Sequence, residues 1–186
     1  MNQVAVIVID VQNDFVTGEL GTPEAQKIVP RIKQKIDNIC YYMDNTEYKL
    51  TNYHIVYTRD THDLYENTVE EDTFPEHCIE DTSGWCIVDE INNERRFWHN
   101  SYVEVIDKDR FSVNWRDILG CPDEILIMGL TTDICVISNA LWLRSLYPRV
   151  PIKVYASCCA GTTPEKHKAA LEVMKSCCIE VVEDEI

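Results

Sequence analysis

The chain has 186 residues, 45% of them hydrophobic, and a formal net charge of −15 from 32 acidic and 17 basic side chains. This length fits one domain with a substantial core, so we expect residues 1–186 to form a single domain. A surface of this sign repels phosphate backbones and anionic lipids, which argues against nucleic acid and membranes as partners and is compatible with a small neutral substrate.

The start of the chain and its cysteines favour a cytoplasmic protein. Met1 leads into the apolar run 4–9 with no basic stretch before it, and that run is far too short to span a bilayer. The nine cysteines are odd in number and irregular in spacing, so they do not indicate a disulfide framework. We therefore expect free thiols in a reducing cytoplasm.

Apolar strands alternate with amphipathic helices along the chain. Short β-branched runs predict strands, and apolar residues recurring every three or four positions predict helices. Residues 61–115 are rich in charges and aromatics and predict long loops with short elements. In chain order we expect strand 4–9, helix 23–43, strand 53–58, strand 124–128, helix 134–146, strand 152–156, helix 164–175 and strand 179–182.

This alternation predicts an α/β fold of three layers, α/β/α, around a mostly parallel, Rossmann-like sheet. Such a sheet places its ligand site just beyond the carboxyl ends of its strands. Reactive side chains that directly follow a strand are therefore the candidates for function.

Cys135 has the setting of an activated thiol. A buried strand ends at Gly129, a short polar turn follows, and Thr132 or Asp133 can cap the next helix. Cys135 then lies in the first helical turn, where the helix dipole and unpaired amides would lower the thiol pKa and bind an oxyanion. The alternative is a buried and inert cysteine.

Asp10 and Lys108 have less specific settings. Asp10 closes the first strand, where a carboxylate is unfavourable without a partner or a role, although it could also cap a turn with Asn13 and Asp14. Lys108 stands in a charged run, so it is a solvated surface residue unless it reaches Cys135 and Asp10.

A candidate metal site follows the second strand. Asp60 and His62 lie on one loop there, and His77 comes further along. One carboxylate and two imidazoles suit a single divalent ion of zinc, iron or manganese, with Glu70 or Glu71 as a fourth ligand. The alternative is a set of solvated loop histidines.

Several segments in chain order carry a family pattern. They are Val8–Phe15 (VIDVQNDF), Asp60–His62 (DTH), Phe74–Cys78 (FPEHC), Lys108–Ser112 (KDRFS), Gly129–Val136 (GLTTDICV) and Pro164–His167 (PEKH). Together they resemble the isochorismatase-like cysteine hydrolases, and within that family the nicotinamidases. The resemblance covers nearly the whole chain and implies the isochorismatase-like hydrolase fold.

The resemblance also implies roles for individual residues. Asp10, Lys108 and Cys135 would form a catalytic triad. A non-proline cis peptide between Leu130 and Thr131 would direct the amide of Thr131, beside that of Cys135, toward the oxyanion. One divalent ion, zinc by expectation, would be held by Asp60, His62, Glu70 and His77. The substrate-binding residues would be Phe15, Phe74 and Leu130.

We therefore expect an amidohydrolase that converts nicotinamide and water to nicotinate and ammonia through a thioester on Cys135. Its partner would be a small neutral amide, and we expect a homo-oligomer. One alternative is another cysteine amidase or carbamoyl-hydrolase of the same family, without the metal. A vinyl-ether hydrolase needs no thiol, so Cys135 argues against it. The last alternative is a catalytically silent metal-binding or redox protein of the same fold.

Overall fold

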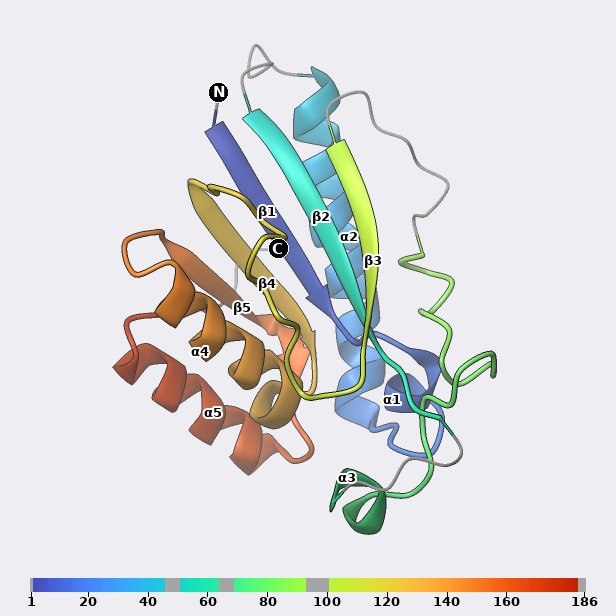
Figure 1. The fold of residues 1–186 in the computed structure, drawn as a ribbon. Helices are drawn as coiled ribbons and strands as arrows, with labels where there is room; N and C mark the ends of the chain where they lie inside the picture. Colours follow the sequence, from blue (N-terminus) through green and yellow to red (C-terminus); the bar gives the residue numbers. More distant parts are fainter. Residues whose placement is uncertain (1, 46–50, 64–68, 93–100, 184–186) are drawn as a thin grey trace.

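The computed structural model describes residues 2–45, 51–63, 69–92 and 101–183 (Figure 1). Six parallel strands form one sheet in the order β3-β2-β1-β4-β5-β6. The strands are β1 (Asn2–Ile9), β2 (Thr51–Asp60), β3 (Ser101–Lys108), β4 (Glu124–Leu130), β5 (Ile152–Ala160) and β6 (Glu180–Val182). The helices are α1 (Asn13–Val16), α2 (Pro23–Asn45), α3 (Val69–Thr73), the π-helical turn η1 (Thr132–Val136), α4 (Ile137–Leu146) and α5 (Pro164–Ser176).

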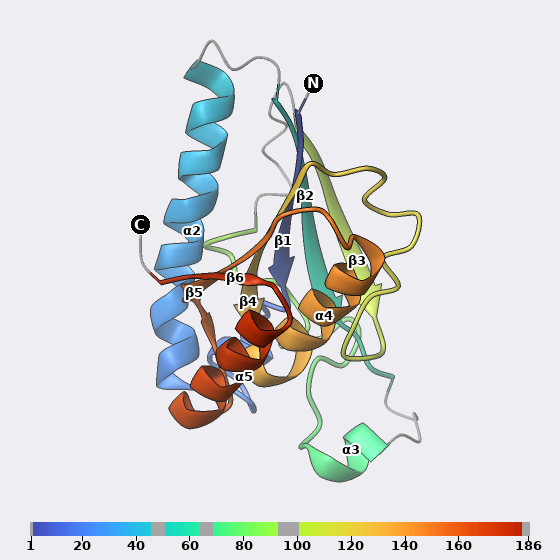
Figure 2. The same cartoon turned by 90° about the vertical axis from the view of Figure 1, so that its left-hand side faces the viewer.

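Helices cover both faces of the sheet, which confirms the expected three-layer α/β/α fold. Figure 2 shows α2 on one face and α4 with α5 on the other. The central strand β1 is apolar on both faces because each face packs against a helix layer. Val4, Val6 and Val8 belong to the core beneath α2. Ala5, Ile7 and Ile9 belong to the core beneath α4 and α5.

Every predicted strand and helix is present, but the short helix α1 and the strand β3 were not predicted. Strand β3 lies inside the segment 61–115, for which the sequence predicted loops and short elements. Its residues Val103, Val105 and Ile106 are only partly buried because β3 is an edge strand. Half-buried edge strands lack the continuous apolar run that identified the central strands.

Strand register brings polar residues to one edge of the sheet. Lys108 at the end of β3 is paired with Asp60 at the end of β2. Ile9, just before Asp10, is paired with Thr58 of β2 and with Gly129 of β4. Helix α3 also lies beyond these carboxyl ends (Figures 1 and 2).

Gly129 lets β4 approach β1 closely at this edge. Its φ is +125°, and a Cβ built on it would lie 2.1 Å from the carbonyl oxygen of Ile9. Only glycine fits such a position. Among the described residues, no helix is both long enough and apolar enough to cross a membrane.

Candidate active site

The structure brings Asp10, Lys108 and Cys135 together at the carboxyl edge of the sheet. The Lys108 ammonium Nζ lies 2.8 Å from Asp10 Oδ2 and 3.8 Å from Cys135 Sγ. All three side chains are buried. Lys108 is therefore not the solvated surface residue that its charged neighbours suggested, because pairing of β3 with β2 carries it inward.

Asp10 is held in an uncommon backbone conformation. Its φ is +49°, in the left-handed region that few residues other than glycine adopt. The Thr58 hydroxyl donates to Asp10 Oδ1 over 2.6 Å, and the Asp10 amide donates to the Thr58 carbonyl over 3.2 Å. Both bonds fix the carboxylate toward Lys108, and such strained residues concentrate at functional sites.

The pKa of the Cys135 thiol is not shifted in the direction that its place at the start of a helix predicts. Burial raises the pKa of the Cys135 thiol, and the Asp10 and Asp60 carboxylates raise it further, although Lys108 acts in the opposite direction. The expected lowering of the thiol pKa by the helix dipole is therefore wrong for the ligand-free site. Burial also raises the pKa of Asp10 despite the nearby Lys108 charge. A carboxyl group with a raised pKa is a suitable proton acceptor for a protonated thiol.

Lys108 remains charged. Burial acts to lower its pKa, but the neighbouring acidic groups, Asp10 foremost and Asp60 as well, outweigh burial and raise the pKa well above its ordinary value. The ammonium can thus stabilise negative charge as it moves between Asp10 and Cys135.

The turn that carries Cys135 begins as a π-helix. Thr131 stands at its N-cap without a side-chain cap bond, so the predicted capping by Thr132 or Asp133 is wrong. These two side chains bond to the start of α5 instead. Asp133 accepts from the amide and the hydroxyl of Thr162, and Thr132 bonds to His167. The peptide bond between Leu130 and Thr131 is cis, as the family pattern implied.

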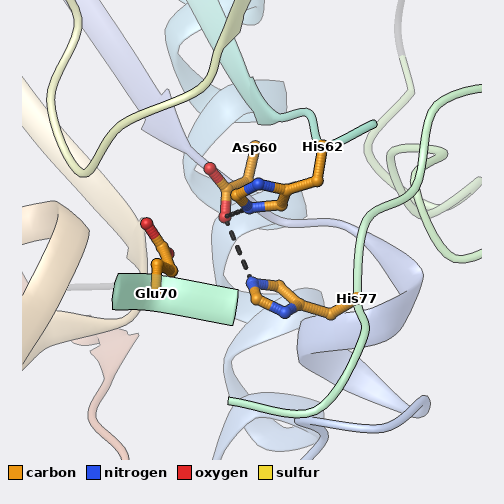
Figure 3. Close-up of side chains that lie close together, drawn as sticks. All are labelled: Asp60, His62, Glu70 and His77. Carbon is orange, nitrogen blue, oxygen red and sulfur yellow. Dashed lines mark hydrogen bonds and ion pairs between the residues drawn. The ribbon is translucent and has the colours of Figure 1, made fainter. Parts of the chain in front are cut away.

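A second cluster contains the four residues expected to hold a metal ion. One ligand atom from each of Asp60, His62, Glu70 and His77 lies within 4.8 Å of all the others (Figure 3). Asp60 Oδ2 lies 3.2 Å from His62 Nε2 and 3.5 Å from His77 Nε2. The side chain of Glu71, the alternative fourth ligand, lies outside the described part of the chain.

The donor atoms of this cluster fit a cation. His77 Nδ1 lies 2.8 Å from the Pro75 carbonyl oxygen, which can only accept, so Nδ1 carries a hydrogen. In a neutral ring Nε2 is then a lone-pair donor facing a carboxylate oxygen (Figure 3). A ring nitrogen with a lone pair and a carboxylate oxygen repel each other unless a proton or a metal ion lies between them. Backbone support of the second ring nitrogen is the usual arrangement for a ligating histidine.

The pKa values in the cluster agree with this picture. Burial acts to raise the pKa of Asp60, but hydrogen bonds with His62 and His77 and the Lys108 charge outweigh it and hold the pKa far below its usual range. Burial acts to lower the pKa of His77, and the bond to Asp60 outweighs it. Asp60 is thus a carboxylate shared by both clusters, since its Oδ1 lies 2.8 Å from Lys108 Nζ.

Two residues that support these clusters were not identified from the sequence. The buried amide of Gln12 donates to the carbonyls of Asp60 and Trp85 over 2.8 and 2.9 Å and accepts from the Asp60 amide over 2.7 Å. Asp14 accepts from the amide of Cys78 over 2.7 Å. The available signal was their position, because both lie within five residues of the end of the first buried strand.

One cavity of about 270 Å³ is lined by residues of both clusters, and its volume is just below the range of roughly 300–1,000 Å³ for ligand pockets. Its lining includes Cys135 and Thr131 together with Asp60, Glu70 and His77. All three predicted substrate-binding residues line it too, namely Phe15, Phe74 and Leu130. Lining residues that the sequence did not indicate include Leu20, Ile134, Thr162 and Lys166.

Known proteins resemble this chain over nearly its whole length. A family model described as an isochorismatase domain matches residues 4–185. The nicotinamidase/pyrazinamidase of Mycobacterium tuberculosis is 28% identical over 196 residues, covering 96% of this chain and 97% of that protein. The nicotinamidase structure from Bacillus subtilis matches with a TM-score of 0.76 and 26% identity, covering 98% of this chain and 100% of the other.

Two further solved structures differ in the activity that their names give. The pyrazinamidase of Pyrococcus horikoshii, in complex with zinc, has a TM-score of 0.73 and 27% identity over 97% of this chain and 99% of its own. The N-carbamoylsarcosine amidase of Thermoplasma acidophilum has a TM-score of 0.72 and 27% identity over 100% of this chain and 99% of its own. Overall similarity therefore does not identify which amide is the substrate, so the residues of the site have to identify it.

Proposed function

This chain belongs to the isochorismatase family, and from that premise we propose that it hydrolyses nicotinamide to nicotinate and ammonia through a thioester on Cys135. The observation that carries the proposal is one small cavity lined by the thiol of Cys135 and by three of the four clustered ligand residues. A flat ring that carries an amide and a ring nitrogen could present the amide to the Cys135 thiol and the nitrogen to the ligand residues.

The proposed reaction starts with Asp10 taking the proton of the Cys135 thiol, while Lys108 stabilises the charged pair. The thiolate attacks the carboxamide carbon, and the amide groups of Thr131 and Cys135 donate to the oxyanion. Asp10 returns the proton to the departing nitrogen, so ammonia leaves and a thioester remains. Water, deprotonated by Asp10, hydrolyses the thioester and regenerates the thiol.

The ligand cluster would orient the substrate. Asp60, His62, Glu70 and His77 would hold one divalent ion, with zinc proposed as its identity. When bound, the ion supplies a Lewis-acid anchor for the pyridine nitrogen. Phe15 and Phe74 provide flat apolar walls, and this fixed orientation places the amide near Cys135.

The remaining expectations fit this proposal. We propose that residues 1–186 are a single domain, supported by one sheet that uses strands from both ends of the chain. We also propose a cytoplasmic location, supported by the free thiols of the described cysteines. The homo-oligomer stays a prediction.

The test compares nicotinamide with benzamide, which keeps the ring and the amide but lacks the ring nitrogen. If the ligand cluster anchors that nitrogen, kcat/KM for benzamide should be lower by at least about 100-fold, because a site built for a polar atom rejects an analogue without it. In the His77→Ala variant the two substrates should react at similar rates. Equal rates in the unaltered protein would contradict the anchoring role, and absence of ammonia release would contradict the proposed substrate.

A second candidate is a carbamoyl-hydrolase that acts on a substrate with an anionic group. Lys166 favours it, because this side chain lines the same cavity and offers a cation in an otherwise acidic protein. Turnover of N-carbamoylsarcosine that exceeds turnover of nicotinamide, and that falls in Lys166→Gln, would select this candidate.

A further inference from the structure

The first turns of α5 are bonded to the turn that carries Cys135. His167 Nδ1 lies 2.8 Å from the Thr132 hydroxyl. Asp133 accepts from the Thr162 amide over 2.8 Å and from the Thr162 hydroxyl over 2.6 Å. Three side-chain hydrogen bonds thus join the segment 161–167 to two consecutive residues that precede the nucleophile.

Close packing accompanies these bonds. A Cβ built on Gly161 would lie 2.7 Å from Asp133 Oδ1 and 2.9 Å from the His167 amide nitrogen. Neither contact is tolerable for a real side chain, so glycine is required for the two segments to approach. Gly161 also lines the catalytic cavity, which places this junction directly against the substrate site.

Thr132 is the member of this junction with most influence on the chemistry. It is completely buried and lies in the chain between Thr131 and Cys135, the two residues proposed to donate to the oxyanion. The carbonyl of Thr131 accepts from the amides of Ile134 and Val136, so the turn moves as one unit. A shift of Thr132 would therefore move both oxyanion donors and the sulfur relative to Lys108.

We propose that His167 is a positioning residue for the proposed amide hydrolysis, which holds the nucleophile turn through its bond to the Thr132 hydroxyl. This inference rests on the proposed function. His167 does not line the catalytic cavity among the residues described there, so it acts through Thr132 and not on the substrate.

The surroundings of His167 favour a neutral ring. It lies on a groove of about 420 Å³ that is lined by residues of α2, β5 and α5. Burial lowers the pKa of the imidazole, and Lys168 acts in the same direction, while the Asp133 carboxylate opposes them. The other charged residues on the groove are Glu24, Lys27, Arg31 and Glu183.

A positioning role predicts a specific kinetic pattern. Displaced oxyanion donors weaken the transition state much more than the bound substrate. His167→Leu should therefore lower kcat by about 10–100-fold and change KM by less than about threefold, since misplacement by 1 Å can cost about 100-fold. His167→Asn should recover most of kcat, because its amide keeps a polar atom near the position of Nδ1 and can donate or accept.

The experiment combines variants on both sides of the bond. Thr132→Val removes the hydroxyl at nearly constant volume and should lower kcat as much as His167→Leu does. The double variant should be no worse than either single one, because both changes remove the same bond. Losses that multiply, or a loss that appears in KM, would overturn the proposal. If His167→Leu does not fold, most of kcat retained in His167→Asn together with a loss in Thr132→Val supports the proposal, and a full kcat in Thr132→Val overturns it.

A second measurement separates this proposal from the choice of substrate. The rate of Cys135 alkylation by iodoacetamide, followed by peptide mass spectrometry, requires no turnover, and the exposed Cys121 and Cys178 serve as internal references. We expect slower alkylation of Cys135 alone in His167→Leu and Thr132→Val, and recovery in His167→Asn. Unchanged alkylation would overturn the positioning role even if nicotinamide proves not to be the substrate.

The matched control is His54→Asn. His54 pairs with Glu104 over 3.1 Å across β2 and β3, six residues before the catalytic end of β2. It shares its residue type with His167, is buried, and pairs across β2 and β3 instead of with the nucleophile turn. The kcat, KM and Cys135 alkylation rate of His54→Asn should equal those of the unaltered protein. If His54→Asn lost as much kcat as His167→Leu, the effect of His167→Leu would not be specific to the nucleophile turn.

Discussion

The nucleophile end of the site comprises Asp10, which directly follows β1, and Cys135, which lies in the turn after the adjacent strand β4. The ligand end comprises the four candidate metal ligands, three of which come from segments between β2 and β3. The nucleophile end is fixed by strand register and by the close approach of Gly129 to β1. The ligand end depends on side chains that bond to loop backbone, such as Asp14 to Cys78. The catalytic residues are thus positioned by the rigid sheet, and most of the residues proposed to bind the ring are positioned by loops. Substitutions at the nucleophile end should therefore affect the reaction itself, and those at the ligand end should affect substrate recognition.

The largest effect should come from Cys135→Ala. Ammonia release should fall by at least about 10,000-fold, as for other covalent nucleophiles, because no thioester can form. Circular dichroism and thermal unfolding should remain near those of the unaltered protein, since a small buried group is replaced by another. A folded variant with substantial activity would show that the nucleophile end is wrongly assigned.

Lys108→Ala should combine a large loss of activity with a loss of stability. It leaves the Asp10 and Asp60 carboxylates buried without their shared cation, which should lower the free energy of unfolding by about 3–5 kcal/mol. Urea unfolding measures this. The control is Lys153→Ala, which breaks the more exposed pair with Glu124 and should cost less than about 1 kcal/mol.

Activity losses within the triad should not multiply. Asp10→Asn and Lys108→Ala should each remove most of kcat, yet neither should lower the residual activity of Cys135→Ala further, because the three side chains act as a unit. Ammonia release by each single and double variant measures this. Full kcat in Lys108→Ala would limit Lys108 to a structural role.

Removal of the metal ion should affect the ligand end selectively. Prolonged treatment with a chelator should lower kcat/KM for nicotinamide by about 100-fold or more and leave the much lower value for benzamide nearly unchanged. Elemental analysis before and after treatment, and recovery on addition of zinc, iron or manganese, identify the ion. Full nicotinamide turnover by metal-free protein would mean that recognition does not use this cluster.

Asp14→Ala should weaken the same end more mildly. It releases the amide of Cys78, next to His77, and a lost supporting contact of this type commonly lowers metal affinity by about 10–100-fold. Competition with a chromophoric chelator measures the affinity. Asp89→Ala, at an exposed position on the same connection, should leave it unchanged.

The smallest effect concerns pH and the junction at His167. Burial holds the pKa of His167 below its ordinary value of 6.5, so the unfolded chain binds a proton more readily than the folded one. Its contribution to stability is therefore complete above about pH 6.5 and decreases as the pH falls through that value toward the lower folded pKa. In His167→Asn, unfolding free energy should decline less between pH 7.5 and 5.5 than in the unaltered protein.

The fold and most of the site residues follow from patterns that are local in the sequence. The buried runs of β1 and β4 identify the central strands, and the residues just after them include Asp10 and Cys135. The candidate ligands were likewise indicated by the pair Asp60 and His62 on one loop. Local patterns succeed here because a strand buried on both faces must be continuously apolar.

Local patterns in the sequence, without the family resemblance, predict neither the contacts nor the protonation of these groups, which the tertiary structure decides. Lys108 lies in a charged run, and only the pairing of edge strand β3 with β2 carries it to Asp60 and Asp10. Helix position predicted a lowered pKa for Cys135, yet burial and two carboxylates from distant segments raise it. Asp133 bonds to Thr162 instead of capping its own helix. Hydrogen bonds, burial and charge act through space, so they are set by residues that lie far apart in the chain, such as Lys108 and Cys135, and no local window of the sequence contains that information.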